Sequence, residues 1–146
     1  MELPKRFQDE NLRLSDFYDE VWVVCPVCAK KAICKSFEEF KKARLFCVHC
    51  GCNKEVSTSL DKNGTILGAA HLFFHAELWL KAAFKNDLFY ALNDKHLEYL
   101  ERYIGATLRE SMDRQHFTLL EKLPRFYHEG KNREALLRII TKLKNQ

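Results

Sequence analysis

Two pairs of closely spaced cysteines limit, more than any other feature, how this chain can fold. Cys25 and Cys28 form the first pair, Cys47 and Cys50 form the second pair, and eighteen residues lie between the pairs. Two residues between paired cysteines let the backbone turn tightly, so that both sulfurs point to one side. We call such a turn a knuckle. Two facing knuckles place four sulfurs about 2.3 Å from one Zn²⁺, so the sequence predicts a zinc ribbon with these four cysteines as ligands.

The chain contains two further cysteines, Cys34 and Cys52, and these leave alternatives open. Cys52 stands two residues after Cys50 and is able to replace it, although Cys50-Gly51-Cys52 lacks the knuckle spacing. A second alternative is that the paired cysteines form two disulfides or stay as buried thiols. We favour metal binding, because a chain without an export signal is expected in the reducing cytoplasm, where disulfides are rare. We expect Cys34 and Cys52 to be small buried side chains or exposed thiols.

The residue that follows each pair affects how well the knuckle forms. Gly51 follows the second pair and suits a backbone position with positive φ, whereas Ala29 stands at the corresponding place after the first pair. We therefore expect the first knuckle to be less ideal than the second.

The predicted site gives no sign of catalysis. Four thiolate ligands leave no open position on the ion for water or a substrate, so the predicted zinc is structural. His71 and His75 have helical i,i+4 spacing with Glu77 nearby, but the HExxH pattern is absent, and a surface or satisfied histidine pair is the better interpretation. We also find no nucleophile elbow and no phosphate-binding loop. The sequence predicts a protein that is not an enzyme and indicates no small-molecule substrate.

The composition is that of an ordinary globular protein. It has 146 residues, of which 47% are hydrophobic, and a formal net charge of +4. Four thiolates around Zn²⁺ carry a net charge of about −2, which brings the loaded protein nearer +2. The most apolar stretch, Ile66 to Phe84, is interrupted by His71, Glu77 and Lys81 and is unsuited to hydrocarbon. We expect a cytoplasmic protein with no membrane partner.

The pattern of strand and helix signals predicts an α+β fold. Residues 1–19 are a polar lead-in, residues 20–60 form the zinc ribbon, residues 61–92 extend it with a β-hairpin, and residues 93–146 form a helical segment packed on the sheet. The expected strands alternate with the cysteine pairs, and they are Val21–Val24, Lys31–Ile33, Ala43–Phe46 and Glu55–Thr58. Asn63-Gly64 is a turn signal.

Two or three helices are expected to back this sheet. The first is capped by Asn93 or Asp94 and runs through Gly105, with its apolar stripe formed by Leu97, Leu100, Ile104 and Leu108. The last is capped by Asn132 and turns four apolar side chains inward: Leu136, Ile139, Ile140 and Leu143.

Basic residues gather in the segment between the two knuckles, where aromatic residues are interleaved with them. The basic set comprises Lys30, Lys31, Lys35, Lys41, Lys42 and Arg44, and the aromatic residues are Phe37, Phe40 and Phe46. Basic and aromatic side chains together are able to hold phosphates and stack on bases. The alternative is that the aromatic rings pack inward and the charges form a solvated rim.

Taken together, the chain resembles a group of small bacterial zinc-ribbon proteins. These are labelled as transcription factor IIB-type zinc ribbons, or as related to the zinc region of the primosomal replication-restart helicase. The resemblance is carried by the paired knuckles and by six short stretches: Leu78-Trp79-Leu80, Tyr90-Ala91-Leu92-Asn93, His96-Leu97-Glu98-Tyr99-Leu100-Glu101, Leu108-Arg109-Glu110, Leu123-Pro124 and Lys131-Asn132-Arg133. It implies the four-cysteine site and no catalytic residue, since motor motifs are absent.

Two classes of function follow from these expectations. The first is a nucleic-acid-associated module that uses the basic and aromatic residues between the knuckles. The second is a protein–protein interaction adaptor or an immunity-type partner protein, anchored by Trp22 or Trp79.

Overall fold

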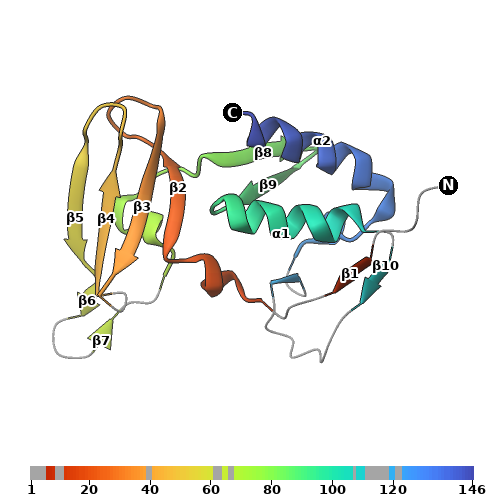
Figure 1. Ribbon diagram of the computed structural model, residues 1–146, viewed down its shortest axis with the longest axis horizontal. Coiled ribbons are helices and arrows are strands. Elements are labelled where there is room, and N and C mark those ends of the chain that lie inside the picture. The colour runs from red at the N-terminus through yellow and green to blue at the C-terminus, as the bar shows by residue number, and fades with distance from the viewer. Residues whose placement is uncertain are drawn as a thin grey trace. The chain divides into compact units, whose positions relative to one another are not determined.

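The computed structural model describes residues 6–8, 12–38, 41–60, 64–65, 68–106, 108–110, 119–120 and 123–146. The chain forms two compact units, which are each made of segments distant in sequence. The ribbon unit comprises Ser15–Lys81 and Tyr90–Asn93, and the helical unit comprises Met1–Leu14, Ala82–Phe89 and Asp94–Gln146. The predicted α+β class is confirmed (Figure 1). Within the described ranges, no helix is long and apolar enough to cross a membrane.

The ribbon unit is built on a four-stranded antiparallel sheet. Its strands follow one another in the order β2 (Glu20–Val24), β3 (Lys31–Phe37), β4 (Lys42–Phe46) and β5 (Asn53–Ser57), shown in orange to yellow in Figure 1. Side chains alternate between the two faces of a strand, and one face of this sheet carries the buried residues Val21, Val23, Ala32, Cys34, Ala43 and Leu45. The short 3₁₀ helix η2 (Ala70–Phe74) contacts β2, β3 and β4.

The outer edge of β2 is covered by the segment that leads into the next hairpin. Leu78 forms an isolated antiparallel bridge with Val23, and the Trp79 N–H donates to the Trp22 carbonyl at 3.0 Å. The Trp22 N–H donates in turn to the Leu92 carbonyl at 2.7 Å. These contacts join the segment to the edge of β2 through an isolated bridge and single hydrogen bonds, and neither strand of the next hairpin belongs to the four-stranded sheet.

Three smaller pairs of strands complete the sheet structure. β6 (Ser59–Leu60) and β7 (Gly64–Thr65) form a short antiparallel hairpin, and Asn63 of the predicted turn lies outside the described residues. β8 (Leu80–Phe84) and β9 (Asp87–Ala91) form a hairpin within the predicted 61–92 segment, as a separate two-stranded sheet. β1 (Arg6–Gln8) pairs in parallel with β10 (Leu108–Glu110).

The helical unit contains the two helices α1 (Asp94–Gly105) and α2 (Arg133–Lys144), which pack against each other. Their apolar stripes are buried largely as predicted, although Ile139 is only half-buried. Aromatic rings fill the space beside them: Phe84 stacks on Phe126 with ring centroids 5.2 Å apart, and Phe89 stacks on Tyr127 at 5.4 Å. The short 3₁₀ segments η1 (Leu14–Phe17), η4 (Arg125–Tyr127) and η5 (Gly130–Asn132) occupy connections.

The end of α1 corrects one prediction. The helix was expected to continue to Leu108, with Gly105 in its interior, but it ends at Gly105 and Leu108 begins β10. Gly105 has a low helix propensity, and the last carbonyls bind a side chain from α2: Arg133 Nε donates to the Ile104 carbonyl at 3.1 Å and Arg133 Nη2 donates to the Ala106 carbonyl at 3.3 Å. These hydrogen bonds satisfy groups that a helix end otherwise leaves unpaired.

The start of α2 corrects a second prediction, that the side chain of Asn132 caps this helix. Asn132 does precede the first helical residue, but its side chain makes no capping hydrogen bond. Its Nδ2 instead donates to the Phe126 carbonyl at 3.2 Å, and its Oδ1 accepts from Lys85 Nζ at 3.3 Å. The buried amide therefore joins three segments of the helical unit rather than the first turn of α2.

Candidate metal centre

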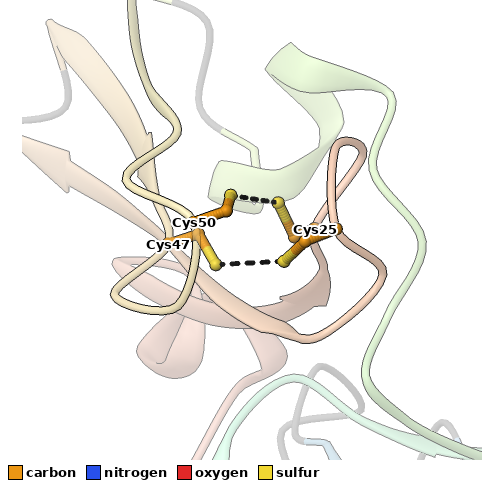
Figure 2. Close-up of side chains that lie close together, drawn as sticks. Cys25, Cys47 and Cys50 are labelled. Atoms are coloured by element: carbon orange, nitrogen blue, oxygen red, sulfur yellow. Dashed lines mark hydrogen bonds between the residues drawn. The ribbon is translucent and has the colours of Figure 1, made fainter.

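The four paired cysteines bring their sulfurs together at one end of the ribbon sheet. Cys25 Sγ lies 3.7 Å from Cys50 Sγ, Cys28 Sγ lies 3.6 Å from Cys47 Sγ, and all four sulfurs lie within 4.8 Å of one another. Figure 2 shows Cys25 on one loop facing Cys47 and Cys50 on the other. We call these four residues the cysteine tetrad.

These distances fit a metal ion and do not fit a disulfide. Sulfurs about 2.3 Å from a central ion at tetrahedral angles lie about 3.8 Å apart, which is close to the two shortest distances. A disulfide needs sulfurs about 2.05 Å apart, and all six cysteines are free thiols. The structure therefore contains no disulfide among the cysteines, and the tetrad is able to hold a metal ion. Across the described residues, no other set of three or more histidine, cysteine or acidic side chains is so placed.

The two knuckles repeat one pattern of backbone hydrogen bonds. The Cys25 N–H donates to the Lys30 carbonyl at 2.8 Å, and the Cys47 N–H donates to the Cys52 carbonyl at 2.9 Å. Each bond joins the first cysteine of a pair to the residue five places later. The bonds close the turns on the backbone alone, which leaves the sulfurs available to an ion.

The residue after each pair adopts a positive φ in both knuckles. Ala29 has a φ of 64° and Gly51 has a φ of 79°. Their N–H groups donate to the carbonyls of Cys25 and Cys47, each at 2.9 Å. The first knuckle is therefore shaped like the second although it lacks glycine. Left-handed backbone costs a residue with a Cβ atom about 1–2 kcal/mol, so the difference between the knuckles lies in strain rather than in shape.

Backbone N–H groups and crowding act oppositely on the four thiols. The backbone N–H of Cys28 is the main cause that lowers the pKa of Cys25 to about 6, and the Val27 N–H adds to it from 3.4 Å. The backbone N–H of Cys52 acts to lower the pKa of Cys50, but burial and the other three sulfurs outweigh it and raise that pKa to about 12. Four close sulfurs resist full ionisation because like charges repel. A bound divalent cation removes that resistance, so the donor set fits a metal ion.

The remaining two cysteines lie apart from the tetrad. Cys34 is fully buried on β3, in the core of the ribbon unit, and burial raises the pKa of its thiol to about 12. It therefore behaves as a small apolar side chain, as expected. Cys52 is partly exposed and is not one of the four clustered residues. The alternative in which Cys52 replaces Cys50 is not the arrangement in this structure.

Four of the six basic residues between the knuckles lie on strands. Lys31 and Lys35 belong to β3, Lys42 and Arg44 belong to β4, and Lys30 and Lys41 stand just before these strands. Strand alternation puts the four strand residues on the side opposite the buried core. We call this side the open face; it consists of every second residue of β2, β3, β4 and β5, counted from Glu20, Lys31, Lys42 and Asn53. All of its residues are exposed or half-buried.

Aromatic side chains share the open face with these cations. They are Trp22, Phe37 and Phe46, each of which is half-buried, and Phe40 lies outside the described residues. Lys31 Nζ lies 3.8 Å from the centroid of the Trp22 ring, and Arg44 Cζ lies 5.5 Å from that of Phe37. The three rings are thus neither fully buried nor fully exposed, and cations lie near two of them.

Ion pairs on the open face are weak enough to exchange partners. Arg44 Nη2 lies 2.9 Å from Glu55 Oε2, and Lys42 Nζ lies 3.9 Å from Glu55 Oε1 and 3.7 Å from Glu38 Oε1. These side chains are all substantially exposed, and exposed pairs contribute about 0–1 kcal/mol. Arg44 and Lys42 are therefore only weakly held by Glu55.

Three basic residues near the end of the chain also form ion pairs with acidic side chains. Arg125 and Lys131 both pair with Glu129, at 3.1 and 3.0 Å, and Lys144 lies 2.6 Å from Glu101. His71 lies in η2, where partial burial lowers its pKa, and His75 follows with a φ of 54°. They do not form a metal-binding group within the described residues.

Comparison with known proteins leaves the interpretation to the residues themselves. No protein-family model, no curated protein and no solved structure matches this chain.

Reasoning from sequence had missed that Trp22 shares a face with the predicted basic set, because Trp22 precedes the first knuckle. The signal was present in the alternation of Val21, Trp22 and Val23, which places Trp22 opposite the two valines.

Proposed function

We propose that this chain is a non-catalytic protein organised by one structural Zn²⁺ and that its ribbon associates with nucleic acid. The sulfur distances of the tetrad carry the first half of the proposal. Tetrahedral sites with four sulfurs suit zinc or iron, and a zinc ion with four thiolates has no position left for a reacting molecule.

Metal analysis of the purified full-length chain tests the zinc assignment. We expect one zinc per chain, and we expect Cys50→Ser to lower that ratio well below one because a hydroxyl is a poor replacement for a thiolate ligand. Cys52→Ser is the matched control, since Cys52 is adjacent in sequence and lies outside the tetrad. Stoichiometric iron, or full zinc content in the Cys50 variant, would contradict the assignment.

The open face supports the proposed association of the ribbon with nucleic acid. It carries four basic side chains, Lys31, Lys35, Lys42 and Arg44, against the acidic Glu20 and Glu55. The excess of positive charge is modest, so we expect weak binding that depends steeply on salt rather than tight binding driven by charge alone.

Retention of the zinc-loaded chain on immobilised DNA and RNA, measured against salt concentration, tests the association. Lys35→Glu is expected to weaken retention at every salt concentration. Lys54→Glu makes the same charge change in the same sheet but on the other side, since Lys54 is the exposed neighbour of Glu55 on β5. Equal effects of the two substitutions would show that the open face has no special role, and no retention at low salt would end the proposal.

One observation favours a protein partner instead, as an adaptor or an immunity-type protein. Val27 and Val48 lie on the two knuckles and are 68% and 82% exposed, although apolar side chains of this size are usually buried. A partner retained from native lysate after nuclease treatment, identified by mass spectrometry and lost when both valines are changed to serine, would support this candidate. Retention that nuclease abolishes would support nucleic acid.

A further inference from the structure

The open face arranges its side chains in rows that cross the strands. Trp22 pairs in register with Ile33, and Ile33 pairs with Phe46, so these three side chains cross the sheet in one row. Lys35 and Arg44 pair with each other one step along the strands, in a row that ends in Glu20 on β2 and Glu55 on β5, and Phe37 pairs with Lys42 a further step along. Neighbouring strands lie about 4.8 Å apart and a step of two residues covers about 7 Å. Trp22 and Phe46 are therefore about 10 Å apart, with the Lys35–Arg44 row beside them.

From this layout we infer that the open face binds a single strand of nucleic acid, with bases stacked on the Trp22–Ile33–Phe46 row and phosphates held by the Lys35–Arg44 row. The inference rests on the proposed nucleic-acid association and names the form of nucleic acid that the ribbon takes. A planar ring at the surface offers a base a stacking partner whatever its identity. The complex is thus expected to have little dependence on base sequence.

Duplex nucleic acid fits the same face poorly. In a duplex both faces of each base are covered by neighbouring pairs, so Trp22 and Phe46 would have nothing to stack on. Reading a duplex in its major groove needs a protruding helix or ribbon, whereas the open face is one side of a sheet. Holding the duplex backbone alone needs many cations, and this face has four basic residues, two of which already lie near Glu55.

The cations that cover two of the rings do not prevent stacking. Lys31 lies over Trp22 and Arg44 lies near Phe37 in the absence of a ligand. Exposed cation–π contacts are generally weaker than base–aromatic stacking, and both side chains are long and flexible. When a strand binds, each is able to turn from the ring to a phosphate, so a ring and a phosphate partner become available together.

The experiment compares a labelled twelve-nucleotide oligo-dT, the corresponding oligo-rU and a twelve-base-pair DNA duplex, by fluorescence anisotropy with the zinc-loaded full chain. We expect at least one of the single strands to bind about tenfold or more tightly than the duplex. Phe46→Leu keeps an apolar side chain but removes the ring, and it is expected to weaken single-strand binding about 5- to 150-fold, the range for losing one stacked base. Phe46→Tyr keeps the ring and should bind like the parent chain.

Charge and ring contributions are separated by their salt dependence. Lys35→Ala is expected to reduce the slope of log affinity against log salt by about 0.7, the value for one phosphate contact in a single strand. Phe46→Leu should leave that slope unchanged, and Lys54→Ala should change neither slope nor affinity. In a Trp79→Phe background, Trp22 is the remaining tryptophan of the two in the chain, and a stacked base should quench its fluorescence.

Each outcome decides between the proposals. Tighter single-strand binding that Phe46→Leu weakens and Phe46→Tyr retains supports the inference, provided that the variants keep their zinc and their circular dichroism. Equal or tighter duplex binding overturns the inference and leaves nucleic-acid association standing. Single-strand binding that is insensitive to Phe46→Leu, with unchanged Trp22 fluorescence, overturns the assignment to this face. No binding of any probe at low salt removes both proposals.

Discussion

The two knuckles differ in one backbone position, and exchanging its residues tests how far backbone strain controls the metal centre. Ala29 and Gly51 have nearly the same φ and make equivalent hydrogen bonds. A Cβ atom added at Gly51 would meet no other atom within 4 Å. The effect of Gly51→Ala should therefore come from the backbone alone, which makes it the counterpart of Ala29→Gly with the opposite sign.

The expected magnitude follows from two opposing contributions. Relieving left-handed strain at Ala29 stabilises the folded chain by about 1–2 kcal/mol, while glycine loses about 0.5–1 kcal/mol more conformational entropy on folding than alanine. Ala29→Gly should therefore stabilise the loaded ribbon by about 0.5–1 kcal/mol, and Gly51→Ala should destabilise it by about as much. Because metal binding and folding are coupled in such sites, apparent zinc affinity should rise or fall about two- to fivefold.

Competition for zinc against a chromophoric chelator measures these changes, and urea unfolding of the loaded chain measures stability independently. The double variant with glycine at 29 and alanine at 51 should lie close to the parent chain if the knuckles contribute independently, and a departure reports coupling between them. The reasoning is refuted if both single substitutions shift zinc affinity in the same direction, or if Ala29→Gly weakens it.

Three further predictions concern the metal, one histidine and one arginine. Removing zinc with a chelator should first unfold residues 20–60, seen as loss of amide hydrogen-exchange protection there while α1 stays protected; unchanged protection would show that the metal does not organise the ribbon. His96 is buried, and burial lowers its pKa from 6.5 to about 4, so the folded chain favours the neutral ring. Its contribution to stability is present above pH 6.5 and is lost as the pH falls toward 4, about 3 kcal/mol in all; urea unfolding against pH should show a shallower dependence in His96→Gln. Arg133→Ala removes the hydrogen bond to the Ile104 carbonyl and should cost about 1–3 kcal/mol, whereas Lys144→Ala, which removes an exposed ion pair, should cost less than about 1 kcal/mol in the same assay.

The metal-site arrangement was predictable because its determinants are local. Two residues between cysteines dictate a knuckle, and the strands that lead into Cys25 and Cys47 show the alternation of a half-buried sheet. The apolar stripe of α2 was equally predictable, since Leu136, Ile140 and Leu143 have helical spacing.

The parts that the sequence did not predict depend on distant partners. Leu108 continues the apolar stripe of α1 at helical spacing, yet it pairs with Arg6, a hundred residues away in the chain, and no local pattern reports such a pairing. Asn132 has the residue type of a helix cap, but the carbonyl of Phe126 and the ammonium of Lys85 compete for its side chain. The open face was missed as a unit because its members come from four strands, although each strand was recognisable.

The four residues of the cysteine tetrad differ in their exposure to solvent, and this difference has a kinetic consequence. Cys25 and Cys47 are buried, Cys28 is intermediate, and Cys50 is exposed. We therefore expect chelators, competing ions and oxidants to reach a bound metal from the Cys50 side and to attack the bond to that sulfur first. Release of the ion and oxidative damage to the protein then begin at the same atom, so the lifetime of the loaded ribbon depends on how well the surroundings of Cys50 keep other molecules away.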